Sequence, residues 1–394
     1  MKRVLVVYEQ ESTTQLMLCN FLKQYASNTG NTVVCKRSLL ITPKLIEWCD
    51  IILTIRSMCP YEVDIIRLAK KAGKICISYW DDDLTENNNN LFVLDARRTA
   101  MIDVLKMSNA VLSPNSYLSE KLSVLGKVNY AITIDTAVDG LEINDSEKMP
   151  NERVRIVYAA GPTHVKDFGS NILNALIRLS RKYPDSFELS FVGVHPVLSC
   201  EPEFSVYYHP CMSMSIYRQH MLSQNYDIGI APLDANEMTK SKYYNKYIDY
   251  TLSDLVGIYS NCLPYTLVVK DGYNGFLADD DEDSWFDKLE VLITNSSLRN
   301  AMRSKANEVL RDRFNLAKIV SKFDKDLEDL INNSVVTAGE CKNSLLASKC
   351  KYIGFRCAYL PIAYIKEIGP RDMLERLVNY IQSVKLIKRE EKRS

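Results

Sequence analysis

A group of charged side chains follows a short apolar run near residue 230. The run Asp227–Pro232 predicts a buried strand. After it, in a segment that favours the start of a helix, come Lys240, Lys242, Lys246 and Asp249. A helix N-terminus binds phosphate through its free N–H groups and its dipole, and a nearby carboxylate can accept hydrogen bonds from a ribose diol. The spacing therefore predicts a site for the anionic and ribose parts of a nucleotide.

A simpler interpretation of the same residues remains open. Surface lysines are usually only solvated. Asp249 lies among Tyr247, Ile248 and Tyr250, so a helix would direct its side chain toward half-buried space, where a carboxylate needs a partner. That partner is either one of the nearby lysines or a sugar diol.

The residues that follow continue this pattern of short apolar runs and turns. Val256–Ser260 and Thr266–Lys270 predict two further buried strands. Asp271-Gly272 and Asn274-Gly275 are turn dipeptides. The stretch from Tyr226 to Trp285 therefore predicts strands, a lysine-bearing loop and a helix in close succession.

Three consecutive carboxylates form a second candidate site, in the first half of the chain. Asp81, Asp82 and Asp83 follow the predicted strand Lys74–Tyr79. They could hold a divalent cation, because hard cations prefer oxygen ligands, or they could form a solvated loop. We favour a third interpretation, in which they contact acceptor hydroxyls, because the carboxyl ends of strands in open α/β sheets face the ligand crevice.

A glycine-containing loop follows the predicted strand Val154–Tyr158. Gly161 would let the backbone approach a ligand closely, His164 and Lys166 could contact phosphate, and Asp167 could cap the next helix. The alternative is an ordinary turn between a strand and a helix. The chain has no G-x-G-x-x-G sequence and no Walker loop, so a dinucleotide or P-loop site lacks support.

Strands and helices alternate along most of the chain, which indicates parallel βαβ units. We expect an α/β fold with a first domain at 1–150, a second at 151–330 and a helical extension at 331–394. Val138–Asn151 is typical of an interdomain linker. In the extension, Arg371–Arg393 predicts an amphipathic helix with a basic end, which either lies at a membrane interface or packs on the protein. Peripheral membrane contact is therefore one interpretation of residues 352–393.

The composition is that of an ordinary globular protein. Of the 394 residues, 46% are apolar and 25% are charged. Lys+Arg and Asp+Glu are equal at 49 each, which argues against nucleic acid as the main partner. The apolar run at the N-terminus is too short for a signal peptide, and no run reaches the roughly 18 apolar residues that a membrane helix needs. We expect a cytoplasmic protein, with a position at the inner face of the membrane as the alternative.

The eleven cysteines form no CxxC pair and indicate reduced, buried side chains. His209 and Cys211 make a lone HxC, which is weak evidence for a metal ion. We therefore expect no metal site.

The chain resembles retaining GT-B glycosyltransferases, specifically the family-4-like enzymes of bacterial polysaccharide synthesis. The resemblance is strongest from Tyr226 to about Phe314 and covers roughly residues 1–330. The segments that carry it are Asp227–Leu233, Lys242 with Asn245–Tyr250, Gly257–Ser260, Pro264-Tyr265, Asp271–Leu277 and Trp285. Tyr158–Asp167 resembles the first strand and glycine loop of the family's second lobe.

This resemblance implies two Rossmann-like, doubly wound domains that face a cleft, the first on the acceptor side and the second holding the nucleotide-sugar. It implies transfer of a hexosyl group, with retention of configuration, from a nucleotide-diphosphate-sugar to a hydroxyl of a glycan or lipid-linked acceptor, without a metal or other cofactor. With the expectations above, the predicted catalytic residues are Lys242 and His164, the other predicted donor-binding residues are Gly161, Lys246, Asp249 and Tyr250, and the predicted acceptor-side residues are Asp81, Asp82 and Asp83.

The sequence departs from the family pattern in three ways. Where the family has the first of two glutamates eight positions apart, this chain has Ser241, so Asp234 or Glu237 would have to substitute, and the second position is Asp249. Tyr8–Thr14 reads YEQESTT where a glycine-rich loop is usual. Two alternatives to a transferase therefore remain open: a nucleotide-sugar epimerase of the GT-B fold, and a non-catalytic partner subunit.

Overall fold

A computed structural model describes residues 1–85, 93–137, 148–149, 151–161, 164, 168–334 and 345–360, together with 362–363, 365–366 and 369–370. The chain divides into two compact units. The first holds the residues up to Ala137 and the described residues from Leu316 onward; the second holds the described residues between them. The predicted linker lies mostly outside the described residues, as do Lys166, Asp167 and Arg371–Arg393.

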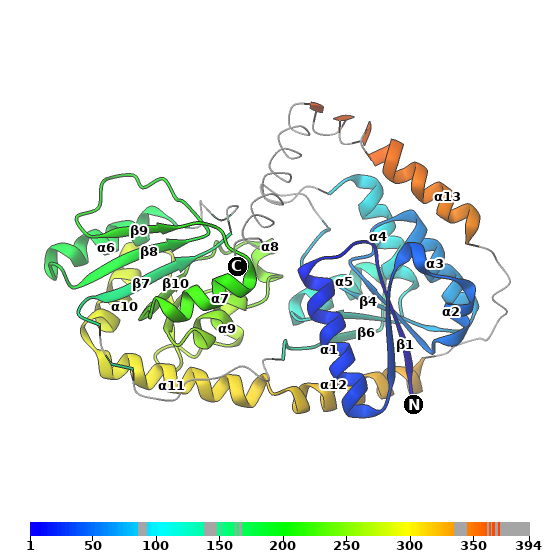
Figure 1. Cartoon of the computed structure of the whole chain (residues 1–394), viewed down its shortest axis with the longest axis horizontal. Coiled ribbons are helices and arrows are strands. Elements are labelled where there is room, and N and C mark those ends of the chain that lie inside the picture. Colours follow the sequence, from blue (N-terminus) through cyan, green and yellow to red (C-terminus); the bar gives the residue numbers. More distant parts are fainter. Residues whose placement is uncertain are drawn as a thin grey trace. The chain divides into compact units, whose positions relative to one another are not determined.

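The first unit is a parallel sheet of six strands in the order β2-β1-β3-β4-β5-β6, covered by helices on both faces (Figure 1). Its strands are β1 (Arg3–Tyr8), β2 (Thr32–Arg37), β3 (Ile51–Ile55), β4 (Ile75–Tyr79), β5 (Ala110–Ser113) and β6 (Tyr130–Thr133). Its helices are α1 (Thr13–Thr29), η1 (Ser38–Leu40), α2 (Pro43–Trp48), α3 (Pro60–Lys71), α4 (Asp95–Met107), α5 (Ser116–Gly126), α12 (Leu316–Asn333), α13 (Leu346–Gly354) and the π-helical turn η4 (Phe355–Tyr359).

Alternate residues of each strand enter different cores. Val4 and Val6 of β1 pack with α1 and α12, whereas Leu5 and Val7 pack with α3. Since both faces are buried, these strands are almost continuously apolar, as parallel strands usually are. This is why they could be located from the sequence.

The helix α12 returns the chain to the first unit. Its apolar face, which includes Phe323 and Leu327, packs beside α1 on the sheet (Figure 1). The ring of Phe323 makes edge contacts with Phe21 and Tyr25, at centroid distances of 5.7 and 5.1 Å. Residues 316–330 therefore belong to the first unit, whereas the sequence placed them in the second domain; an amphipathic pattern shows that a helix has a buried face but not which sheet it covers.

The second unit is also a parallel sheet of six strands, in the order β12-β11-β10-β7-β8-β9. Its strands are β7 (Val154–Ala159), β8 (Phe187–Val192), β9 (Val206–His209), β10 (Ile228–Ala231), β11 (Val256–Ser260) and β12 (Phe276–Ala278). Its helices are α6 (Ser170–Lys182), α7 (Met214–Ser223), α8 (Glu237–Lys240), α9 (Asn245–Leu252), η3 (Tyr265–Leu267), α10 (Glu282–Thr294) and α11 (Ser296–Arg313). Helices α6 and α10 contribute to one core, and α7, α9 and α11 to the other.

The predicted strand Thr266–Lys270 is wrong. Val268 and Val269 are buried as expected, but they follow the short helix η3 and pair with no strand. The backbone of this segment forms hydrogen bonds with the side chain of Asn274 instead of with a strand. The Asn274 Oδ1 accepts from the Lys270 N–H at 2.7 Å, and its Nδ2 donates to the Val268 carbonyl at 2.9 Å. The strand that pairs with β11 is β12, which follows the two predicted turns.

Candidate functional site

The loops after β7 and β10 leave the same edge of the second sheet, because these two strands are parallel neighbours. The first loop carries Gly161 and His164, and the second carries Lys242 and leads into α9 with Lys246 and Asp249. The structure thus brings the loops that hold the predicted donor-binding residues to one edge of the sheet.

Tyr250 fixes α9 to this edge. Its side chain is fully buried, and its hydroxyl donates to the Ile230 carbonyl at 2.8 Å and accepts from the Ala159 N–H at 3.4 Å. One side chain therefore joins α9 to the ends of both β7 and β10. Tyr250 thus holds α9 against the strands that carry the two loops. Its direct contact with a donor stays a prediction.

Two glycines of the sheet leave room for the rings of Tyr250 and Tyr259. Gly229 of β10 and Gly257 of β11 are neighbours in register. A Cβ atom at Gly229 would lie 2.4 Å from the Tyr250 ring, and one at Gly257 would lie 2.1 Å from the Tyr259 ring. Real Cβ atoms essentially never come this close to another atom. Glycine at 229 therefore lets Tyr250 of α9 lie against the sheet, and glycine at 257 leaves room for the ring of Tyr259.

Asp249 lies in a half-buried group with Lys246 and Tyr217 of α7. The Lys246 Nζ is 3.5 Å from an Asp249 carboxylate oxygen, and it lies over the Tyr217 ring at 5.6 Å from its centroid. Burial, and then the charge of Asp249, raise the pKa of Tyr217. In the described part of the chain the buried Tyr217 hydroxyl has no hydrogen-bond partner. The simple interpretation of Asp249, a pair with a nearby lysine, is thus present, and two-thirds or more of each charged side chain is buried beside an aromatic ring.

Lys242 lies half-buried between the two short helices of the second loop. Asn236 and Thr239 close the start of α8 with reciprocal hydrogen bonds of 3.0 and 2.9 Å, which is a capping box. The Lys242 N–H then donates to the Thr239 carbonyl at 3.1 Å. The capping box and this hydrogen bond therefore fix the backbone position of Lys242.

The missing acidic position of the family pattern is closed to a ligand here. Ser241 is fully buried. Of the two predicted substitutes, Glu237 pairs with Lys240 and Asp234 is exposed. No described carboxylate occupies the place of Ser241, so Asp249 is the acidic residue that this loop and helix offer at half-buried depth.

Gly161 is exposed, and a Cβ atom there would meet nothing nearer than the His164 ring at 3.9 Å. The His164 N–H donates to the Gly161 carbonyl at 3.0 Å, and the His164 carbonyl accepts from the Tyr158 hydroxyl at 3.0 Å. This loop is therefore fastened to β7 through Tyr158 while Gly161 stays open to a ligand.

In the first unit, the predicted acceptor-side carboxylates are paired with cations. Asp81 and Asp82 each lie 2.5 Å from the guanidinium of Arg56, which follows β3. Asp83 is buried and lies 2.7 Å from the Lys121 ammonium. All three lie beyond the carboxyl end of β4, as predicted. Their acceptor role stays a prediction, and it would use the carboxylate lone pairs that these cations leave.

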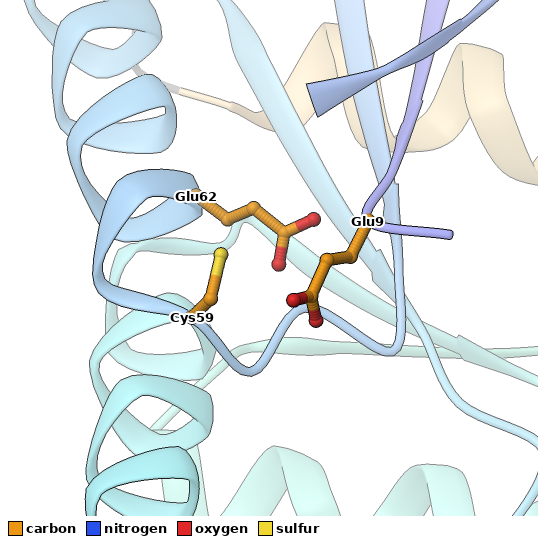
Figure 2. A group of neighbouring side chains, drawn as sticks. All are labelled: Glu9, Cys59 and Glu62. Atoms are coloured by element: carbon orange, nitrogen blue, oxygen red, sulfur yellow. The ribbon is translucent and has the colours of Figure 1, made fainter. Parts of the chain in front are cut away.

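A second polar group in the first unit was not predicted. Glu9, Cys59 and Glu62 place one oxygen or sulfur atom each within 4.8 Å of one another (Figure 2). All three are buried. Burial, and then the charge of Glu9, raise the pKa of Glu62 to about 8. These side chains are near enough to bind a metal ion, but the raised pKa shows that a proton on Glu62 also relieves the repulsion between the two carboxylates.

The charge of Glu9 is already matched by arginines. Arg97 of α4 donates to its carboxylate at 2.9 Å, and Arg356 of η4 lies at 3.5 Å. Tyr352 of α13 donates its hydroxyl to the same carboxylate at 3.1 Å. A divalent cation would have to compete with two guanidinium groups, so the group fits a proton better than a metal ion.

Sequence reasoning missed Tyr217 and the group around Glu9. Tyr217 lies in an ordinary amphipathic helix, and only its closeness to Lys246 and Asp249 in the structure shows that it belongs to this site. Glu9, Arg97 and Arg356 come from three distant segments. The one available signal was the carboxylate directly after the apolar run of β1, at a position where a ligand crevice is expected.

Known proteins match this chain by structure and not by sequence. No family model matches the chain, and no curated protein matches its sequence. The chain is similar to Alr3699/HepE of Anabaena, solved in complex with UDP and glucose, with 12% identity and a TM-score of 0.56 over 84% of this chain and 100% of that chain. A glycosyltransferase of Rickettsia africae gives 13% identity and a TM-score of 0.57 over 84% and 99% of the two chains.

An alpha-glucosyltransferase solved with UDP and a 13-mer DNA is similar over 84% of this chain and 99% of that chain, with 12% identity and a TM-score of 0.55. These identities are low, so the likeness concerns the fold. The two parallel sheets, their flanking helices and the helical C-terminal region agree with it. The chain therefore has the GT-B fold, in which it is similar to glycosyltransferases.

Proposed function

We propose that the chain is a retaining glycosyltransferase that moves a hexosyl group from a nucleotide-diphosphate-sugar to a hydroxyl of a glycan or lipid-linked acceptor. The fold supports a nucleotide-sugar enzyme, because HepE was solved with UDP-glucose. The observation that carries the proposal is the joint placement of open Gly161, half-buried Lys242 and the Lys246–Asp249 pair at one edge of the second sheet.

The proposed roles follow from charge and reach. Lys242 and His164 are the proposed catalytic residues, and they stabilise the diphosphate as negative charge develops on it. Lys246 adds positive charge at the start of α9, Asp249 accepts from the ribose diol, and the Gly161 backbone faces the diphosphate. In the reaction the bond from the sugar to the diphosphate breaks and a bond to the acceptor oxygen forms on the same face. The acceptor proton goes to the diphosphate, so no cofactor is required.

The acceptor is proposed to meet the enzyme at the first unit, through Asp81, Asp82 and Asp83. Carboxylates that share their charge with Arg56 and Lys121 can still accept hydrogen bonds from sugar hydroxyls. The equal numbers of acidic and basic residues keep a glycan or lipid-linked sugar preferable to a nucleic acid acceptor.

The first experiment is a donor panel. Purified protein is heated with UDP-, GDP-, ADP- and dTDP-sugars, and we expect one donor class to raise the melting temperature and to release its nucleoside diphosphate when an acceptor is present. Change of the sugar's stereochemistry without an acceptor would identify an epimerase instead. Binding without transfer to any acceptor would identify a non-catalytic subunit, and no response to any donor would contradict the proposal.

The second experiment tests the role of Lys242. We expect Lys242→Ala to lower turnover by about 10²-fold or more, the loss seen when a group that stabilises developing charge is removed. Lys240→Ala is the matched control, because Lys240 pairs with Glu237 on the exposed side of α8. Equal turnover in both variants would refute the role of Lys242.

A further inference from the structure

Leu345, helix α13, the turn η4 and the described residues after it, up to Lys366, present buried residues to the first unit and exposed apolar residues outward. The inner residues, which are buried, are Leu345, Tyr352, Leu360 and Ala363. The outer residues are large and apolar, with exposed fractions between 41% and 69%: Leu346, Ile353, Tyr359, Ile362 and Ile365. Soluble surfaces carry single exposed apolar residues, but several large ones gathered on one segment mark an interaction surface.

The inner face is fastened, so the direction of the outer face is fixed. Tyr352 packs its ring on Tyr61 of α3 at a centroid distance of 5.7 Å and donates its hydroxyl to Glu9 at 3.1 Å. Leu360 packs with Leu94, which precedes α4. Figure 1 shows α13 lying along the outside of the first unit next to α3. The segment cannot turn its apolar row inward without breaking these contacts.

The charge of this segment has one sign. Between residues 345 and 366 the sequence contains Lys349, Lys351, Arg356 and Lys366 and no acidic residue, in a chain whose totals of basic and acidic residues are equal, at 49 each. Arg356 is held by Glu9, whereas Lys351 and Lys366 are exposed. Lys349 follows Leu346 by three residues and precedes Ile353 by four, so it lies in the same helical stripe.

We infer that this outer α13 face, made of the apolar row above and its lysines, lies on the surface of an anionic lipid bilayer. Apolar side chains bounded by basic residues are the pattern of a helix that enters the headgroup region of a membrane. Among the described helices, none is long and apolar enough to cross a membrane, so the contact is with the surface. This inference does not depend on sugar transfer, and it gives the protein a place beside acceptors that are anchored in lipid.

The test is sedimentation of the full-length protein with vesicles of phosphatidylcholine alone and with added phosphatidylglycerol. We expect binding to the anionic vesicles and much weaker binding to the neutral ones. Replacing Lys349 and Lys351 with Gln is expected to lower the partition coefficient on anionic vesicles about fivefold per lysine. Ile353→Glu is expected to remove measurable binding, whereas Val124→Glu, a change of an 80% exposed valine on α5, leaves it unchanged.

Two results would overturn the inference. The first is equal vesicle binding by wild type and Ile353→Glu. The second is a wild-type dimer that binds no vesicles and becomes monomeric in Ile353→Glu, since a second copy of the chain would then cover this face. Thermal unfolding serves as the fold control: Ile353 is 54% exposed, so its variant should keep the wild-type midpoint, and a clear fall would show that another part of the chain covers the row.

Discussion

Replacing Glu62 with Gln should change how the stability of the first unit depends on pH. The Glu62 side chain has no exposed surface, and one of its carboxylate oxygens has no hydrogen-bond partner among the described residues. Burial, and then the charge of Glu9, raise its pKa from an ordinary 4.5 to about 8. The folded state therefore holds a proton on Glu62 in a pH range where the unfolded state has released it.

The direction in which stability changes with pH follows from proton linkage. The stability that this proton contributes is fully present below pH 4.5 and is lost as the pH rises toward about 8. Across that window one extra bound proton changes the folding equilibrium constant by up to tenfold per pH unit. Glutamine has nearly the same shape and carries no charge, so Glu62→Gln should remove this dependence and be the more stable of the two proteins at pH 8.

The assay is urea unfolding at pH 5, 6, 7 and 8, followed by tryptophan fluorescence. The chain has three tryptophans, so a Trp285→Phe background leaves only Trp48 and Trp80, which both lie in the first unit. Glu120→Gln, at an exposed position of α5, is the control for loss of a carboxylate. Parallel curves for wild type and Glu62→Gln would refute the bound proton; a chelator that then destabilised only the wild type would show that a metal ion takes its place.

Two further changes test the packing that positions the site. Gly229→Ala places a Cβ atom 2.4 Å from the Tyr250 ring, so it should push α9 from the sheet, cost about 1–3 kcal/mol of stability and weaken donor binding; calorimetry showing an unchanged melting temperature would contradict this. Phe323→Ala removes the edge contacts with Phe21 and Tyr25 and should cost about 3–5 kcal/mol in urea unfolding, whereas a loss below 1 kcal/mol would mean that α12 adds little to the first unit.

The parts of the fold that could be predicted are those that depend on short-range pattern. Parallel strands covered on both faces are apolar throughout, so β1, β3, β7 and β10 stand out as runs between turn residues. The prediction of a strand at 266–270 was wrong because its buried valines give the same hydrophobic pattern as a strand. What decides it is the side chain of Asn274, whose hydrogen bonds to Lys270 and Val268 no pattern of hydrophobicity reveals.

The candidate site divides in the same way. Lys242 and Asp249 belong to one loop and to the helix that follows it, so the sequence could predict that they lie on neighbouring elements. The group around Glu9 could not be found like this, because Glu9 follows β1, Glu62 lies on α3 and Arg356 lies on η4. Packing of α3 on the sheet brings Glu62 to Glu9, and Arg356 and Tyr352 reach Glu9 only because the C-terminal segment folds onto the first unit.

This dependence makes the C-terminal segment a structural part of the first unit. Asp324 of α12 receives hydrogen bonds from the Lys2 ammonium at 2.7 Å and from the Tyr25 hydroxyl at 2.5 Å. At the other sheet face, Arg356 and Tyr352 reach Glu9. Residues near the N-terminus thus form ion pairs with α12 on one face of the sheet and with η4 on the other, and burial of α12 adds apolar contacts to them. Because α13 is held by the same residues that balance Glu9, its outward apolar row is presented by a fixed helix, as a surface that enters a bilayer interface requires.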